Sequence, residues 1–235
     1  MGFTIGSIGG LGALREINHL RPGGRRRVRA SVCTAVAEYT GLWGWAVVPG
    51  ARAVRAVRAG GARAACSCGA PACPAPGTHP LDASLEVPAG ATLQEATRAW
   101  STVPGAGLLL PTGRTFDVIE LAEAAGRSAL VRLERMGLPL GPVALTPQGR
   151  AWFFVAPGAA AELPHLLYRM GWDDARLDLR GLGKGEYITA PPSDRAGLGP
   201  VRWLRGPSPD GVSRPPEARL LLGTLAYVAH RSAQR

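Results

Sequence analysis

Lysine and long apolar runs are what this sequence most clearly lacks. Lys184 is the only lysine among its 235 residues, so arginine carries nearly all of the positive charge. No stretch approaches the roughly 20 apolar residues that a membrane-spanning helix needs. The arginines of the N-terminal region follow its apolar run, whereas a secretory signal places its charges first. We therefore expect no membrane span, no export signal and a cytoplasmic protein.

Sequence patterns of several common enzyme classes are also missing. No Ser/His/Asp or Cys/His set stands in a context that would activate a nucleophile. The glycines of Gly181-Leu-Gly183-Lys-Gly185 are too closely spaced, and wrongly placed, for a dinucleotide-binding fingerprint. The sequence shows no internal repeat. These absences argue against nucleophilic hydrolases, dinucleotide enzymes and repeat proteins.

The charge balance is strongly basic and uneven. The chain has 27 Lys and Arg against 17 Asp and Glu, a net charge of +10. Residues 1–65 hold ten arginines against two glutamates, which leaves the rest of the chain close to neutral. Arginine donates paired hydrogen bonds to phosphate, so this distribution favours DNA or RNA as a partner. The alternative is that a GC-rich bacterial genome uses arginine for ordinary surface charge.

The composition and the order of predicted elements indicate one globular domain. Hydrophobic residues make up 46% of the chain and charged residues 19%, enough to build a core. Residues 1–29 lack periodicity and are interpreted as a flexible basic arm. Residues 30–232 alternate between helical and strand patterns, which predicts a mixed α/β (α+β) domain. Helices are expected at 30–43, 92–100, 122–136, 160–170 and 216–230, and strands at 45–48, 108–110, 116–121, 143–145, 152–155, 177–179, 186–189 and 201–204.

A cysteine-rich loop at residues 60–80 is the sharpest local signal. Cys66, Cys68, Cys73 and His79 lie within fourteen residues, and three thiolates with one imidazole suit a tetrahedral Zn²⁺ site. Four protein ligands leave no open position, which predicts a structural zinc. Free or redox-active cysteines are the alternative. Cys33 belongs to the first predicted helix and is expected to be a buried structural residue.

Several motifs, taken in order, carry a resemblance to a known family. They are Gly44 to Pro49, the Cys/His loop, Trp100, Pro104-Gly105-Ala106, Leu108 to Leu110, Thr112-Gly113-Arg114, Thr146-Pro147-Gln148-Gly149-Arg150, Leu177 to Gly181, and Tyr187 to Ser193. Over roughly residues 30–205 this order resembles the bifunctional DNA primase/polymerase N-terminal (Prim-Pol) domain of the archaeo-eukaryotic primase superfamily. The resemblance implies an RRM-like core joined to a smaller α/β unit. It also implies nucleotide joining with two Mg²⁺ or Mn²⁺ ions, in DNA replication.

The polymerase centre implied by the family departs from its pattern here. The family has an Asp-x-Asp pair on a strand, a Ser-x-His that holds phosphates, and a third Asp. In this sequence Asp117 and Glu120 fall on opposite faces of a regular strand, and only a bulge, or a switch to helix after Leu121, would bring Glu120 and Glu123 together. Ala151 or Trp152 stands at the His position, where Trp152 is a candidate for stacking on a base. Asp178 matches the third acid.

The resemblance and its departures lead to three hypotheses. The first is a protein that binds nucleic acid or a nucleotide through Arg150, Arg180 and Lys184, with an inactive polymerase centre. The second is an active DNA primase/polymerase that uses Asp178 with Asp117, Glu120 or Glu123. The third is a regulatory scaffold that binds protein partners.

Overall fold

The computed structural model describes residues 32–58, 61–172 and 176–234 and shows a mixed α+β fold. For residues 54–58 and 61–64 it describes the backbone only. The predicted basic arm at 1–29 lies outside the described residues. No helix in the described part of the chain is both long and apolar enough to cross a bilayer.

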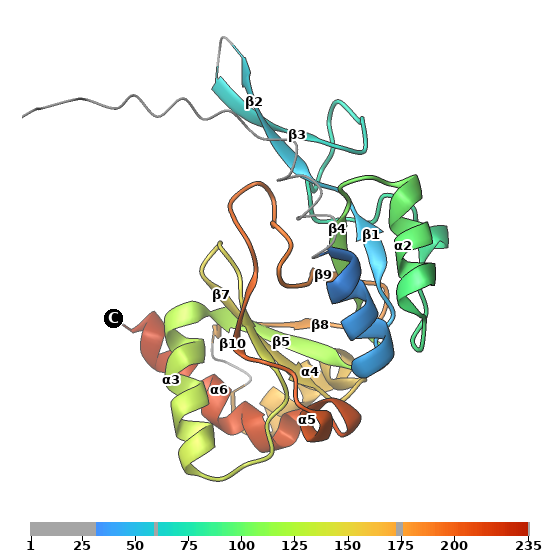
Figure 1. Cartoon of the computed structure of the whole chain (residues 1–235). Coiled ribbons are helices and arrows are strands. Elements are labelled where there is room, and N and C mark those ends of the chain that lie inside the picture. Colours follow the sequence, from blue (N-terminus) through green and yellow to red (C-terminus); the bar gives the residue numbers. More distant parts are fainter. Residues whose placement is uncertain (1–31, 59–60, 173–175, 235) are drawn as a thin grey trace, which may run out of the picture.

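A five-stranded antiparallel sheet forms the larger half of the fold (Figure 1). Its strands, in spatial order, are β10 (Arg202–Arg205), β6 (Val143–Leu145), β7 (Arg150–Val155), β5 (Asp117–Ala122) and β8 (Leu179–Leu182). Helix α3 (Glu123–Arg135) connects β5 to β6, and α4 (Ala159–Arg169) connects β7 to β8. The segment from β5 to β8 is therefore a β-α-β-β-α-β unit with a split βαβ arrangement.

Helices cover one face of this sheet. Side chains alternate between the two faces of a strand. Ile119, Leu121 and Phe153 therefore point to the same side, where they pack with α3, α4 and α6 (Ala218–Ala233). Figure 1 shows these three helices together, on the side of the sheet away from the smaller sheet.

The opposite face packs against an N-terminal unit. Its sheet has the order β1 (Val48–Gly50), β4 (Gly107–Pro111) and β9 (Tyr187–Thr189). Aromatic rings join the two sheets, because Phe116 lies 4.5 Å from Phe154 and 5.1 Å from Trp45 between ring centroids. The shared core holds the smaller unit over the non-helical face of the large sheet.

The remaining elements include both confirmed and wrong predictions. Helix α2 (Leu93–Thr102) begins with the predicted capping box, in which Thr92 and Glu95 bond reciprocally. The first helix, at 32–37, continues as the π-helix η1 (Glu38–Leu42). The strand predicted at 45–48 is found at 48–50 (β1), because these are the residues that pair with β4. Two short helices were not predicted: η2 (Ala83–Leu85) and α5 (Pro209–Ser213).

The loop predicted at 60–80 contains a strand, so that prediction was wrong in part. β2 (Ala53–Arg58) and β3 (Gly61–Cys66) form a hairpin. Neither segment alternates apolar with polar residues, which is why the sequence pattern gave no strand signal. Similarly, β8 begins at Leu179 rather than at 177, because its ladder with β5 pairs Leu179 with Leu121.

Two helical glycines provide a test of the packing. A Cβ atom on Gly126 of α3 would lie 2.3 Å from the Cβ of Ala151, whereas one on Gly223 of α6 would meet no atom within 4 Å. We expect Gly126→Val to lower the free energy of unfolding by about 2 kcal/mol through overpacking. Gly223→Ala should instead raise it by about 0.5–1 kcal/mol, through helix propensity. Urea denaturation of both variants measures the difference, and equal effects would contradict this packing.

Candidate functional site

The predicted metal ligands come together at the base of the β2–β3 hairpin. Cys66 is the last residue of β3, and Cys68, Cys73 and His79 follow in the next turns. Their ligand atoms all lie within 4.8 Å of one another. The Nε2 of His79 lies 3.3 Å from Sγ of Cys66 and 3.4 Å from Sγ of Cys73. Zn–S and Zn–N bonds of about 2.3 and 2.0 Å in a tetrahedron separate neighbouring ligands by roughly 3.5 Å, so the cluster fits a structural zinc site.

The surroundings of His79 orient it for metal binding. Its Nδ1 lies 2.7 Å from the carbonyl oxygen of Pro80. A carbonyl can only accept, so Nδ1 carries the proton and Nε2 presents its lone pair to the sulfur atoms. The pKa of Cys66 falls to about 6: partial burial raises it, but hydrogen bonds from the backbone of Cys68 and Gly77 are the main effects that outweigh the burial. One ligand is thus readily available as a thiolate.

The loop is also tied to the rest of the fold. The backbone N–H of Ala51 donates to the carbonyl oxygen of His79 at 2.9 Å. Gly77 has φ +72°, and a Cβ there would lie 2.6 Å from the backbone nitrogen of Ala53. Only glycine allows this close approach of the loop to β2. A metal bound here would therefore hold the hairpin and the edge of β1 together.

The acidic residues of β5 lie on opposite faces, as the sequence predicted. Asp117 is buried on the helical face, where its Oδ2 accepts a bond from the backbone N–H of Ala160 at 2.8 Å. This contact satisfies one of the backbone N–H groups that the first turn of α4 leaves without a partner inside the helix. Glu120 points to the other face, with Trp152 and Arg180 beside it on the neighbouring strands. Glu123 begins α3 and pairs with Arg127 at 2.8 Å.

Arg150 joins the two acids that the fold does bring together. Its Nη1 and Nη2 donate to the Asp178 carboxylate at 2.6 and 2.7 Å, and its Nε lies 3.3 Å from Oε1 of Glu120. The second oxygen of Glu120 accepts a bond from the Trp152 indole at 2.7 Å. The Arg150 hydrogen bond lowers the pKa of Asp178, so this carboxylate is ionised at neutral pH. Arg150 thus bridges two carboxylates.

Metal ligands cluster in one place within the described ranges. The Cys/His group is the only set there of three or more Cys, His, Asp or Glu side chains whose ligand atoms converge. Glu120 and Asp178 meet around Arg150, while Asp117 and Glu123 have the separate partners given above. The fold therefore gathers two of the four candidate acids.

Arg180 lies on β8, and Lys184 lies in the turn that connects β8 to β9. Arg180 pairs with Glu186 at 2.6 Å, and the same carboxylate accepts a bond from the backbone N–H of Gly183 at 2.9 Å. The Thr112 hydroxyl bonds the carbonyl of Gly183, which fixes the turn against β4. Lys184 is exposed at its tip. This part of the chain thus presents Lys184 as an exposed cation that forms no ion pair among the described residues, next to Arg180, which pairs with Glu186.

Arg195 is a further cation of this site that no sequence signal singles out. It comes from the loop between β9 and β10, and its guanidinium lies 4.8 Å from the centre of the Trp152 ring. Burial lowers its pKa. Among the described residues, the guanidinium of Arg195 makes one hydrogen bond, to the Thr189 hydroxyl at 3.3 Å, and no carboxylate lies within 4 Å of it. Trp152 itself is fully buried, so the prediction that it could stack on a base was wrong.

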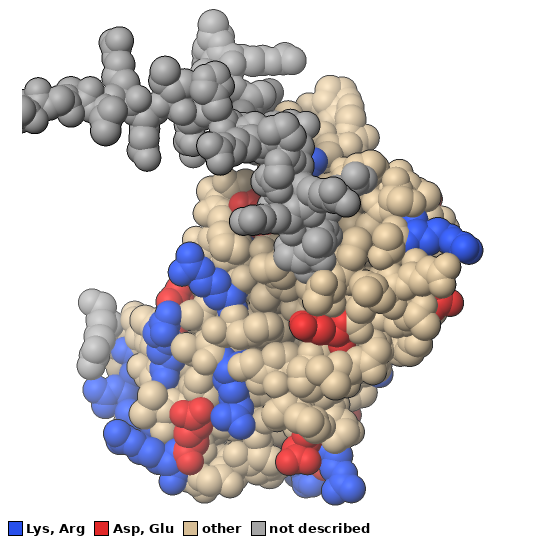
Figure 2. Space-filling view, in the orientation of Figure 1, with Lys and Arg blue, Asp and Glu red and all other residues tan. Residues whose placement is uncertain are grey.

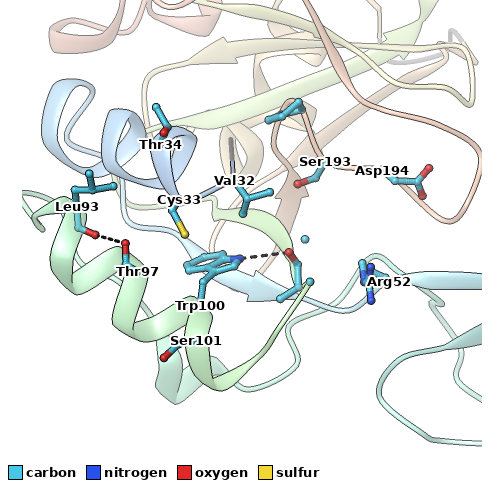
Figure 3. A pocket seen from close by; sticks show the side chains of 14 residues that line it. Val32, Cys33, Thr34, Arg52, Leu93, Thr97, Trp100, Ser101, Ser193 and Asp194 are labelled. Atoms are coloured by element: carbon cyan, nitrogen blue, oxygen red, sulfur yellow. Dashed lines mark hydrogen bonds between the residues drawn. The ribbon is translucent and has the colours of Figure 1, made fainter. Parts of the chain in front are cut away.

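A separate apolar pocket of about 730 Å³ lies in the N-terminal unit (Figure 3). Cys33, from the first helix, points toward Trp100 of α2, and Ser193 and Asp194 come from the loop that also carries Arg195. Cys33 is half-buried here, not buried as predicted, and it is not part of the Cys/His cluster.

The fold and its metal cluster define the chain as a mixed α+β protein with a Cys₃His site. Comparison with protein families gives a match over residues 36–218 to "Bifunctional DNA primase/polymerase, N-terminal". The chain belongs to this Prim-Pol family, which confirms the resemblance seen in its motifs. Membership indicates a primase/polymerase-like nucleic-acid protein with DNA and nucleotides as ligands. Comparisons with curated proteins and with solved structures give no match.

Proposed function

We propose that this protein is a zinc-stabilised Prim-Pol domain that binds nucleic acid or a nucleotide without polymerising it. The observation that carries the proposal is the bridge of Arg150 between Glu120 and Asp178. A guanidinium that pairs with both acids neutralises their negative charge, which would otherwise attract a metal cation.

The acids are a poor fit to a pair of catalytic metal ions. Mg²⁺ and Mn²⁺ bind hard oxygen ligands, and two-metal catalysis needs carboxylates that converge on both ions. Asp117 faces the helices and is bonded to α4, and Trp152 occupies the neighbourhood where the family pattern has a histidine. The remaining pair, Glu120 and Asp178, is held by Arg150. We therefore assign no metal-dependent step to this centre.

The same face of the sheet suits an anionic ligand. The spatial order β8-β5-β7-β6 agrees with the RRM-like core that the family resemblance implies, and sheets of this type bind nucleic acid on the face away from their helices. In this protein the N-terminal unit covers the buried middle of that face, so a ligand would bind where cations stand beside the covered part. Arg180 and Arg195 lie on or over that face, and Lys184 extends the positive charge at its edge. Ten arginines within residues 1–65 add to the attraction for phosphate.

Binding to DNA tests the first part of the proposal. We expect fluorescence anisotropy to detect binding of a labelled single-stranded oligonucleotide that weakens steeply with salt. Arg195→Gln should weaken it about threefold to tenfold and reduce the salt slope by about 1. Arg169→Gln, at an exposed position in the last turn of α4, serves as the matched control and should change affinity less than about twofold. Salt-independent binding, or none, would reject this part.

Primer extension tests the second part. With Mn²⁺, a primed template and all four deoxynucleotides, the protein is expected to give no extended product, and Asp178→Ala should behave identically. A product that disappears in Asp178→Ala would show an active centre. That result would overturn the proposal and favour an active primase/polymerase that uses Glu120 and Asp178.

A further inference from the structure

A groove lies between α3 and α6 on the outer side of the helical layer, away from the sheet face discussed above. The two helices pack side by side (Figure 1), and the groove between them has a volume of about 460 Å³. It is lined by Arg132, Arg135, Met136, Gly223, Thr224 and Tyr227. Gly223 has no side chain and open space in front of it, so α6 leaves room in the groove at this position.

The groove carries positive charge that the described part of the chain leaves unbalanced. Arg132, Arg135 and Arg231 stand in the last turns of α3 and α6, and no described carboxylate lies within 4 Å of them. Helix α6 contains no acidic residue, and the two acids of α3 pair with Arg127 and Arg205. Figure 2 shows several arginine side chains over this region, at the lower left, with acidic side chains between them.

Tyr227 fixes two of these arginines. The guanidinium of Arg132 lies 5.1 Å from the centre of its ring and that of Arg231 lies 5.9 Å from it. Arg231 also donates to the Tyr227 hydroxyl at 3.3 Å. Cation–π contacts of this kind restrict the side chains, so the charges are already placed before a ligand arrives.

Apolar side chains are also exposed on these two helices, and they indicate what kind of partner the groove binds. Val131, Met136, Leu220 and Tyr227 are 48%, 61%, 42% and 38% exposed, all on α3 and α6 or at the end of α3. A phosphate backbone would make no use of this apolar surface. A second copy of the chain would bring the same arginines against each other. Apolar contact and negative charge occur together on an acidic amphipathic helix, which binds by laying its apolar face in a groove.

We propose that the α3–α6 groove is a docking site for an acidic amphipathic helix of a partner protein. The apolar face of that helix packs along Met136, Gly223 and Tyr227, and its carboxylates pair with Arg132, Arg135 and Arg231. The inference is independent of what the sheet face binds.

A synthetic peptide tests the groove in the full-length protein. The probe is a fluorescein-labelled peptide of about four helical turns made from Ala, Leu and Glu, with Leu at i, i+3, i+4 and i+7. A second peptide carries Gln in place of every Glu. We expect the Glu peptide to bind saturably and the Gln peptide to bind about tenfold more weakly. Arg132→Gln/Arg135→Gln should weaken the Glu peptide about tenfold, whereas Gly223→Leu, which fills the groove, should weaken both peptides.

Controls separate docking from loss of fold and from nucleic-acid binding. Arg169→Gln should leave peptide affinity within about twofold, and circular dichroism should show that each variant is folded. No saturable binding of the Glu peptide up to about 1 mM would reject the proposal. So would binding that is indifferent to both groove variants. If Arg132→Gln/Arg135→Gln instead weakens only a labelled oligonucleotide, the groove is a nucleic-acid contact and the proposal is wrong.

Discussion

Removal of zinc is expected to lower the melting temperature of this protein by about 10 °C. An ion that binds only the folded state stabilises it by about 4 kcal/mol when its free concentration is a thousand times its dissociation constant. For a chain of this size each kcal/mol shifts the melting temperature by about 2–4 °C. The loss of stability should extend beyond the Cys/His loop, because the backbone N–H of Ala51, just before β2, donates a hydrogen bond to the carbonyl oxygen of His79. Thermal unfolding with and without a chelator measures it.

The cysteines supply a matched pair of variants for this prediction. The purified protein should contain about one equivalent of zinc by elemental analysis, and Cys68→Ser should lose most of it and unfold at the lower temperature. Cys33→Ser, outside the cluster, should keep its zinc. An intact melting temperature after complete zinc removal would contradict a structural role. Zinc loss in Cys33→Ser would show that the ligand set is different.

Loss of the Arg150 side chain is expected to have the second large effect. Glu120 and Asp178 would lose their shared cation, and the Glu120 side chain is only 15% exposed. We expect Arg150→Ala to lower the free energy of unfolding by about 2 kcal/mol, less than for a fully buried pair because Asp178 is half-exposed. In Arg150→Ala, the carboxylates of Glu120 and Asp178 should also bind Mn²⁺ weakly, which we do not expect of the wild-type protein.

A double-variant cycle isolates the cause. In Arg150→Ala/Glu120→Gln the uncompensated charge is removed, so part of the lost stability should return and the Mn²⁺ affinity should disappear. Urea denaturation gives the stabilities, and the paramagnetic resonance signal of free Mn²⁺ gives the binding. Equal Mn²⁺ binding before and after Arg150→Ala would mean that Arg150 does not block a cation, and the proposed loss of catalysis would lose its main support.

Local features of this protein could be predicted from short stretches of sequence. The predicted zinc ligands Cys66, Cys68, Cys73 and His79 converge, because they lie within fourteen residues whose glycine turns allow the chain to fold back on itself. The helix α2 begins at its predicted cap for the same reason, since Thr92 and Glu95 satisfy each other within one turn. The opposite faces of Asp117 and Glu120 also followed from strand periodicity alone.

What the sequence could not provide are contacts between distant segments. The β2–β3 hairpin has no apolar alternation and is defined by its backbone ladder, so it carried no periodic signal. The Arg195–Trp152 contact joins a loop to a strand 43 positions earlier in the chain, and an isolated arginine between Asp194 and Ala196 gives no hint of it. The groove between α3 and α6 likewise exists only after two helices far apart in the chain have packed together.

The sequence by itself determined the family, the Cys/His cluster that fits a metal and the face on which each acid of β5 lies, because those depend on residue order and local geometry. Tertiary structure alone decided that Arg150 pairs with both Glu120 and Asp178. The pairing depends on the register of three strands, and a shift of one residue in any of them would turn these side chains to other faces of the sheet.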